Sequence, residues 1–187
     1  GVEKNLILIC NYLVKNVESL KIITISKKFK KKFSTSIEFI TFSANFLDKL
    51  SRRIKYLLSI FLLVKEILKN RKIVVLSFQA NLYCIIICKL FSVKVISRSN
   101  SAPIGWSKNF IKRFIFKIVL NLSNEVLVNS YQFKRDLKKE FGLNARTIYN
   151  PLNKNEILRK SKQRARKIFI TKKLKILNIG RFTDQKD

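Results

Sequence analysis

The sequence predicts an α/β protein in which helices cover both faces of a parallel sheet. Short apolar segments typical of buried strands alternate along the chain with longer segments whose apolar residues recur at helical spacing. Strand, helix and strand units in this order close as right-handed crossovers between parallel strands. Hydrophobic residues make up 47% of the 187 residues, which is ample material for a core.

The first part of the chain contains a predicted helix and two predicted strands. Apolar residues recur every three or four positions over residues 1–17, which indicates a helix. A strand of the buried parallel type is predicted over 20–26, followed by a basic loop over 27–32 and a weaker strand over 37–42. Because the first element is a helix, we expect the sequence to begin after the first strand of its domain.

The middle of the chain repeats this alternation. A long helix with basic residues at both ends is predicted over 47–70, a strand over 73–78, a helix over 80–91 and a strand over 93–97. Residues 98–107 are the most polar and least regular segment. We expect them to form a loop after a strand, where α/β sheets bind their ligands.

The clearest strand, helix and strand unit runs from Glu125 to Pro151, after a helix predicted over 108–122. Ser130 should cap the amino terminus of its helix, and Gly142 should end that helix in a left-handed conformation. Asn150-Pro151 should take the chain out of the sheet. We therefore predict that a first domain ends at residue 151.

The composition changes after this point. Residues 152–173 are rich in Lys and Arg and poor in large apolar residues, which predicts a basic linker or an exposed helical connection. A new strand is predicted over 174–179. Since one strand cannot form a domain, we expect residues 174–187 to be the first strand and loop of a second domain, so that the sequence is a fragment at both ends.

The charge of the chain is strongly positive. Forty Lys and Arg against eleven Asp and Glu give a net charge of +29, which suggests an anionic partner such as acidic membrane lipid, a phosphorylated metabolite or nucleic acid. The abundance of Lys, Ile, Asn and Phe is also what an AT-biased coding sequence produces. Both explanations stay open.

The cysteine pattern and the hydropathy of the chain argue against a zinc protein and against a membrane-spanning one. Cys10, Cys84 and Cys88 lack Cys-x-x-Cys spacing and the chain has no histidine, which argues against a zinc site. Cys84 and Cys88 should share a buried helix face, which suits a reducing compartment. The longest apolar run, residues 56–64, is about half of the ~20 residues that a membrane helix needs. We therefore expect no membrane span.

Short motifs follow the predicted strands in a definite order. They are Gly1-Val2-Glu3-Lys4, Arg98-Ser99-Asn100 with Pro103, Val128-Asn129-Ser130, Ile148-Tyr149-Asn150-Pro151, and Gly180-Arg181 with Gln185-Lys186. Together these motifs resemble those of family-four glycosyltransferases, which are retaining enzymes of the GT-B fold. The resemblance implies a Rossmann-like amino-terminal domain that holds the acceptor, facing a carboxyl-terminal domain that binds a nucleotide-sugar donor.

The resemblance implies that Gly1, Arg181 and Lys186 bind the donor. A glycine at the start of a helix lets the backbone approach the donor phosphate, and the two cations would neutralise the leaving diphosphate. Gly1 is alternatively just the first residue of the sequence, and Arg181 with Lys186 an ordinary exposed basic turn.

Acceptor binding is implied for Arg98, Asn100 and Asn81, which follow predicted strands and should project into the cleft. A guanidinium and two amides can hold acceptor hydroxyls or phosphate. The same side chains can instead cap helices or satisfy loop backbone, and for neighbouring Gln79 this second role is favoured.

The paired glutamates that the family uses around the donor sugar would lie beyond Asp187. No catalytic residue can be named, and the sequence as given is expected to be inactive. The resemblance implies transfer of a sugar, in surface polysaccharide or lipopolysaccharide synthesis, to a glycan or lipid-linked acceptor. Neither a metal nor a cofactor is expected, since the nucleotide-sugar is the substrate. The implied location is the cytoplasm, with peripheral contact to the inner face of the cell membrane.

The basic helices suit an acceptor held in an anionic membrane. The predicted contact combines residues 49–55, Trp106 and residues 108–117; alternatively the aromatic side chains pack in the core and the lysines face water. The alternative function is a basic nucleic-acid-binding module or a non-catalytic relative. The basic residues are spread over every element, and no RNP, zinc-finger or helix-turn-helix pattern occurs, so no specific nucleic acid is expected.

Overall fold

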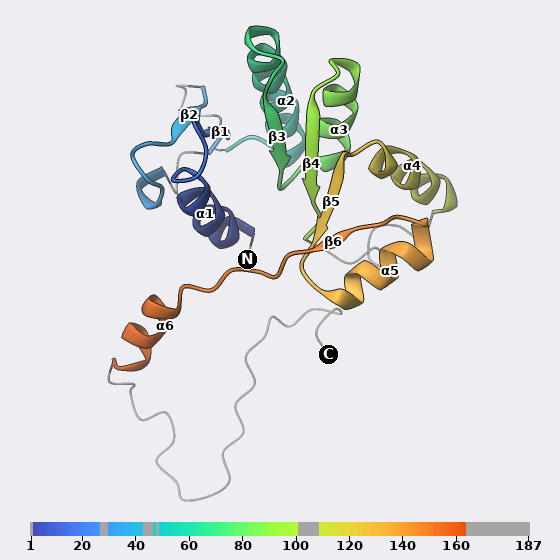
Figure 1. Ribbon diagram of the computed structural model, residues 1–187. Coiled ribbons are helices and arrows are strands. Elements are labelled where there is room, and N and C mark those ends of the chain that lie inside the picture. Colours follow the sequence, from blue (N-terminus) through green and yellow to red (C-terminus); the bar gives the residue numbers. More distant parts are fainter. Residues whose placement is uncertain (1, 27–29, 43–46, 48, 101–108, 164–187) are drawn as a thin grey trace, which may run out of the picture. The chain divides into compact units, whose positions relative to one another are not determined.

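The computed structural model describes residues 2–26, 30–42, 47, 49–100 and 109–163 (Figure 1). It divides the chain into two units, Gly1–Leu152 and Asn153–Asp187. This division lies one residue after the Asn150-Pro151 pair. The predicted strand at 174–179 and the residues Gly1, Arg181 and Lys186 lie outside the described residues.

A small parallel sheet joins β1 (Lys21–Ile23) and β2 (Glu38–Ile40), with Ile22 beside Phe39. Neighbouring residues of a strand point to opposite faces. Ile22 packs with α1 (Val2–Leu13), whereas Ile23 belongs to a cluster with α2 (Arg52–Lys69). Helices thus cover both faces of this sheet, as predicted. A short 3-10 helix, η1 (Lys30–Lys32), lies between the two strands.

Four more strands form a second parallel sheet in the order β3-β4-β5-β6. Three helices connect them in turn, so each crossover moves the chain one strand along the sheet. The strands are β3 (Val74–Ser77), β4 (Lys94–Arg98), β5 (Glu125–Val128) and β6 (Arg146–Thr147), and the helices are α3 (Asn81–Leu90), α4 (Phe110–Asn121) and α5 (Tyr131–Phe141).

The main core lies on one face of this second sheet. Val95 and Val126 point to that face and pack with buried residues of α2, α3, α4 and α5. On the other face Leu76 and Ile96 are half-buried and belong to none of the three core clusters of the described residues, and Val74 is 59% exposed. The helices of the main core therefore cover one face of this sheet, and helices on its other face stay a prediction.

The observed strands also form two sheets where one was predicted. Each strand needs a hydrogen-bonded neighbour to extend a sheet. β1 pairs with β2 and β3 pairs with β4, and the described strands contain no pair that connects β1 to β3. The α/β class with parallel strands is confirmed, but the single continuous sheet is not.

The helix ends predicted from the sequence agree with the structure for α5 but not for the start of α2. The Ser130 side chain accepts a hydrogen bond from the Phe133 amide at 3.2 Å, and Gly142 closes α5 with φ 67°, both as predicted. The helix predicted over 47–70 starts only at Arg52 because Ser51 caps it, with its side chain accepting from the Ile54 amide. Such a cap fixes the first turn of a helix.

The second unit contains one described helix, α6 (Lys154–Ser161). Asn153 caps it, since its side-chain oxygen accepts a hydrogen bond from the Glu156 amide at 3.0 Å. No residue of α6 is buried, and Lys160 pairs with Glu156 at 2.6 Å one turn away. This helix fits the exposed helical connection that was one of the two predictions for residues 152–173.

Candidate functional site at the carboxyl edge of the sheet

Three residues predicted to bind the acceptor meet at the carboxyl ends of β3 and β4. The Asn81 side-chain amide donates to the carbonyl of Arg98 at 3.0 Å. The Asn100 amide donates to the carbonyl of Phe78 at 3.0 Å, and lies 3.4 Å from the carbonyl of Arg98. Side chains from the ends of two neighbouring strands therefore share one network, as expected for this edge of a parallel sheet.

Asn81 owes its position to the turn after β3. Ser77, the last residue of that strand, is buried, and its hydroxyl lies 2.7 Å from Asn81 Oδ1 and 2.9 Å from the carbonyl of Gln79. Ala80 has φ 54°, which turns the chain sharply into α3. Asn81 uses both ends of its amide within the protein, so its first role is to hold β3 and β4 together.

Arg98 lies at the centre of the cluster and is only 1% exposed. It was expected in the loop but forms the last residue of β4. Its Nη2 donates to the carbonyl of Ile148 and to Oδ1 of Asn150, both at 3.1 Å. Asn150 Oδ1 also accepts from the Asn5 amide at 2.8 Å. The arginine thus connects β4 with the segment after β6 and, through Asn150, with α1.

The charge of Arg98 has no acidic partner among the described residues, where the ion pairs involve other side chains. Its Nε is buried without a hydrogen-bond partner there, and its guanidinium lies 6.0 Å from the centre of the Phe78 ring. Burial lowers the pKa of Arg98, because the interior disfavours the charged form. Isolated buried charges are costly and occur mostly where a function requires them.

Sequence reasoning found Asn81, Arg98 and Asn100 because each stands close to the end of a predicted strand. It did not assign Asn150 to the site, although the Asn-Pro pair marked its position. It missed Asn5 entirely, since no pattern within α1 indicates contact with a residue 145 positions later. Such pairs become visible only once the order of the strands is known.

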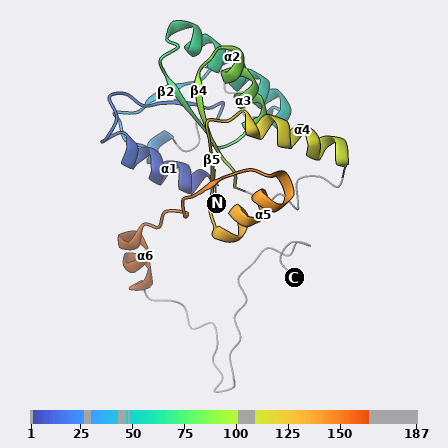
Figure 2. The ribbon, with the colours of Figure 1, turned by 45° about the vertical axis from the view of Figure 1, so that its right-hand side comes forward.

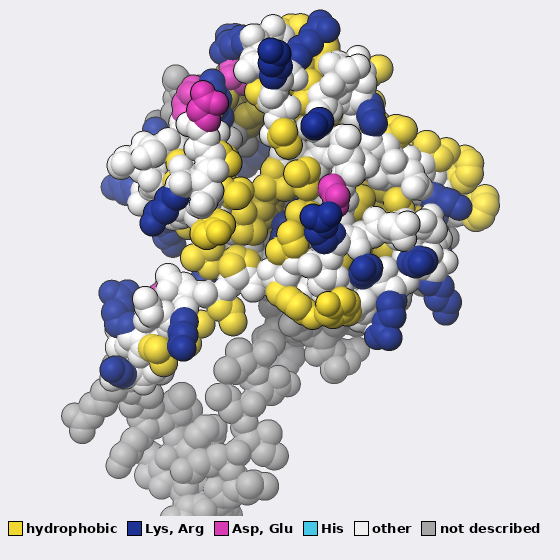
Figure 3. Space-filling model, viewed as in Figure 1, with side chains coloured by type: hydrophobic (Ala, Val, Ile, Leu, Met, Phe, Trp, Pro, Cys, Tyr) yellow, Lys and Arg dark blue, Asp and Glu magenta, His cyan; other side chains and the backbone are white. Residues whose placement is uncertain are grey.

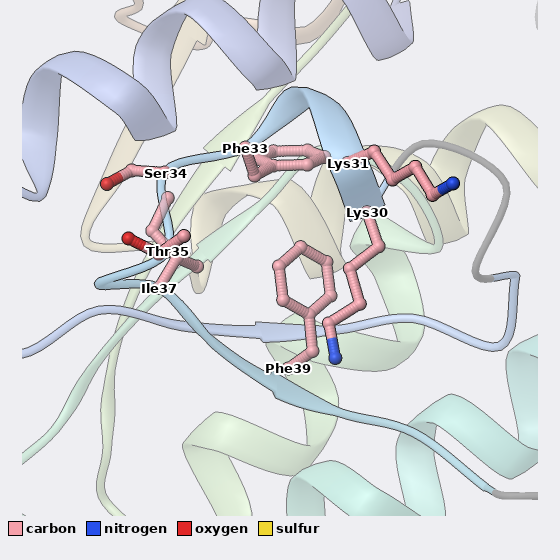
Figure 4. A pocket seen from close by; sticks show the side chains of 7 residues that line it. All are labelled: Lys30, Lys31, Phe33, Ser34, Thr35, Ile37 and Phe39. Atoms are coloured by element: carbon pink, nitrogen blue, oxygen red, sulfur yellow. The ribbon is translucent and has the colours of Figure 1, made fainter.

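A separate hollow lies beside β2 and has a volume of about 580 Å³ (Figure 4). In Figure 4 the side chains of Lys30 and Phe39 lie next to each other, and the ammonium nitrogen is 5.5 Å from the ring centre. The hollow is lined by Lys30, Lys31, Phe33, Ser34, Thr35, Ile37 and Phe39. None of these residues belongs to the Arg98 cluster.

The cysteines behave as small hydrophobic residues. Cys88 is fully buried in the main core and Cys84 packs against that core, as predicted. Burial raises the pKa of the Cys88 thiol to about 12.

In the described ranges, no group of three or more His, Cys, Asp and Glu side chains could hold a metal ion. None of the helices found there is long and apolar enough to cross a membrane.

No protein-family model matches the sequence, and comparison with curated proteins gave no match. Only the residues and their geometry therefore bear on what the chain does.

Proposed function

We propose that this chain forms the acceptor side of a retaining glycosyltransferase of the GT-B type, which transfers a sugar from a nucleotide-sugar to a glycan or lipid-linked acceptor. One observation carries the proposal: Asn81, Arg98 and Asn100, which the motif resemblance implied for acceptor binding, converge at the carboxyl edge of a parallel sheet. This edge is where α/β folds bind ligands.

The three residues have different tasks in this proposal. Asn81 positions the other two, because its amide joins the ends of β3 and β4. Asn100 is half-buried and uses its Nδ2 to hold the backbone, which leaves Oδ1 to accept a hydrogen bond from an acceptor hydroxyl. Arg98 is closed off from solvent, so it acts through its charge and by fixing Ile148 and Asn150. A fixed cation at low dielectric favours a phosphate of the acceptor or of the leaving group.

The donor side of the proposal rests on the motifs alone. Arg181 and Lys186 would neutralise the diphosphate as the glycosidic bond breaks, and Gly1 would let the backbone approach it. The rate of sugar transfer would be raised mainly by placing donor and acceptor together and by stabilising the leaving diphosphate.

A transfer assay with the intact gene product tests the proposal. Radiolabelled nucleotide-sugars are supplied one at a time together with bacterial membranes and soluble glycans, and label in lipid-linked and glycan products is measured. We expect one donor to support transfer. Asn100→Ala should lower kcat/KM about tenfold, the loss of one hydrogen bond in the transition state. It should also lower the free energy of unfolding by about 1 kcal/mol, because the hydrogen bond to the Phe78 carbonyl is lost, which leaves the protein folded.

Asn16→Ala is the matched control. Its side-chain amide likewise donates to a backbone carbonyl, that of Tyr12 at 2.9 Å, but at an exposed position just after α1. Activity of this variant should equal that of the wild type. Failure of the whole donor panel, or equal activity of the Asn100→Ala and Asn16→Ala proteins, would contradict the proposal.

A further inference from the structure

The outer face of α4 is apolar and exposed. Phe110 is 80% exposed and Ile111 is 67% exposed, at positions where the alternative prediction placed aromatic side chains in the core. Space-filling spheres of hydrophobic side chains project from α4 at the right-hand edge of Figure 3. The exposed apolar residues of this face, called here the α4 face, are Phe110, Ile111, Phe114, Ile115, Ile118 and Leu122.

The α4 face is distinct from the side of the helix that holds it to the protein. Phe116, Val119 and Leu120 point the other way and pack in the main core. At 3.6 residues per turn, the six side chains of the α4 face lie within an arc of about 140°. This is the width of an apolar stripe that a helix normally buries. A stripe of this width is normally buried against another surface, and the described residues leave the α4 face uncovered.

Basic residues border the α4 face on both margins. By the same helical spacing, Lys117 lies next to Phe110 and Lys112 lies beyond Ile115, and both lysines are exposed. Neither α4 nor α3 contains an acidic residue. The two helices lie side by side (Figures 1 and 2), and α3 exposes its own apolar residues, including Leu90 at 75%.

We propose that the α4 face docks on an anionic membrane surface, with its apolar side chains at the boundary between headgroups and acyl chains. Lys112 and Lys117 then face the lipid phosphates. A helix with one apolar face bordered by lysines has the composition of interfacial membrane helices. This inference concerns a surface separate from the Arg98 cluster and does not depend on sugar transfer.

The observations favour a membrane over other occupants. A second copy of the chain would bring the same lysines and a net charge of +29 against its own, so the two copies would repel each other. Nucleic acid is bound through stacking and phosphate contacts. The α4 face instead has Ile111, Ile115 and Ile118 among its six residues, which neither stack on bases nor donate hydrogen bonds.

Flotation with lipid vesicles tests the inference. The chain is mixed with vesicles of phosphatidylcholine, with or without phosphatidylglycerol, at physiological salt. We expect binding to the anionic vesicles only. The double variant Phe110→Ser/Phe114→Ser should lower the partition coefficient at least about tenfold, since two large apolar side chains no longer leave water. Lys112→Gln/Lys117→Gln should lower it by roughly 25-fold, at about a factor of five for each lysine.

Two double variants on α2 serve as matched controls. Leu57→Ser/Phe61→Ser removes equally exposed apolar residues, and Arg52→Gln/Arg53→Gln removes the same charge from the amino-terminal end of that helix, within the region of the contact predicted from sequence. Both should bind almost as the wild type does. Circular dichroism and thermal unfolding confirm that each variant is folded.

Equal loss in the matched α2 controls would overturn the inference, because binding would then follow overall charge or apolarity. Unchanged binding of the Phe110→Ser/Phe114→Ser protein would also overturn it. The same holds if sedimentation equilibrium without vesicles shows self-association that this variant abolishes, since the α4 face would then be a contact between copies. Loss confined to the α4 variants supports the membrane.

Discussion

The Arg98 cluster and the α4 face depart from the usual distribution of residues in opposite ways. The first buries a positive charge where apolar side chains would be more stable, and the second exposes six apolar side chains where polar ones would be more soluble. A fold requires neither arrangement. The comparison teaches that the two regions differ in their partners: Arg98 has hydrogen-bond partners within its own unit, whereas the described residues provide none that covers the α4 face.

The largest expected difference lies between two phenylalanines. Phe133 is buried in the main core, so Phe133→Ala should lower the free energy of unfolding by about 3–5 kcal/mol. Phe114→Ala on the α4 face should change it by less than about 0.5 kcal/mol. Urea denaturation followed by circular dichroism measures both. A cost above 1 kcal/mol for Phe114→Ala, beyond that roughly neutral range, would show that the α4 face is part of the core.

At Arg98 we expect a smaller effect, in which a substitution raises the free energy of unfolding instead of lowering it. Arg98→Met keeps much of the side-chain length while removing a buried charge, so it should raise the free energy of unfolding by about 1–2 kcal/mol. Arg113→Met, which breaks a partly exposed pair with Glu140, should lower it by less than about 1 kcal/mol. A marked loss of stability in the Arg98→Met protein would mean that its two hydrogen bonds outweigh the cost of burial.

The smallest effect concerns the ion pairs between α2 and β1. Hydrogen bonds from Lys69 and then Lys21 hold the pKa of Glu66 below its usual value, and Glu66 in turn raises the pKa of Lys21. A lowered acidic pKa stabilises the fold above the unfolded value and loses this effect as pH falls through the folded value. Stability should therefore decline in acid, below about pH 4.

The raised pKa of Lys21 has the opposite sign, so its contribution to stability is complete below the unfolded value of about 10.4 and is lost as pH rises through the higher folded value. Glu66→Gln should lower the free energy of unfolding by about 1 kcal/mol at pH 7 and flatten its acid limb. Thermal melts from pH 3 to pH 7 compare the two proteins at roughly one-unit steps across the carboxylate range. If the wild type and the Glu66→Gln protein lose stability equally in acid, the loss comes from other carboxylates.

Much of the fold follows from local patterns. Every described helix and strand of the first unit lies where hydrophobic periodicity predicted it, apart from η1, because burial of one face imposes that periodicity. End positions were less accurate. The helix predicted over 1–17 ends at Leu13, since spacing shows which face is apolar but not where the hydrogen bonds stop.

The two notable regions were predictable to different degrees. Residues at strand ends pointed to Arg98, but its contact with Asn150 depends on a register that joins positions 52 residues apart. In α4 the apolar residues surround most of the helix, so the sequence could not tell whether Phe110 and Phe114 or Phe116 faces the core. The neighbouring helices decide this, and they bury Phe116.

The hydrogen bond from Asn5 Nδ2 to Asn150 Oδ1, 2.8 Å long, joins two residues that stand near opposite ends of the first unit in the sequence. Two segments that lie side by side in this way can be joined by a short linker without disturbing the fold between them. The order of the elements along the chain can then be changed while their arrangement in space stays the same. The exposed turn at residues 70–72, between α2 and β3, offers a new place for the chain to begin, so the unit is a natural candidate for circular permutation.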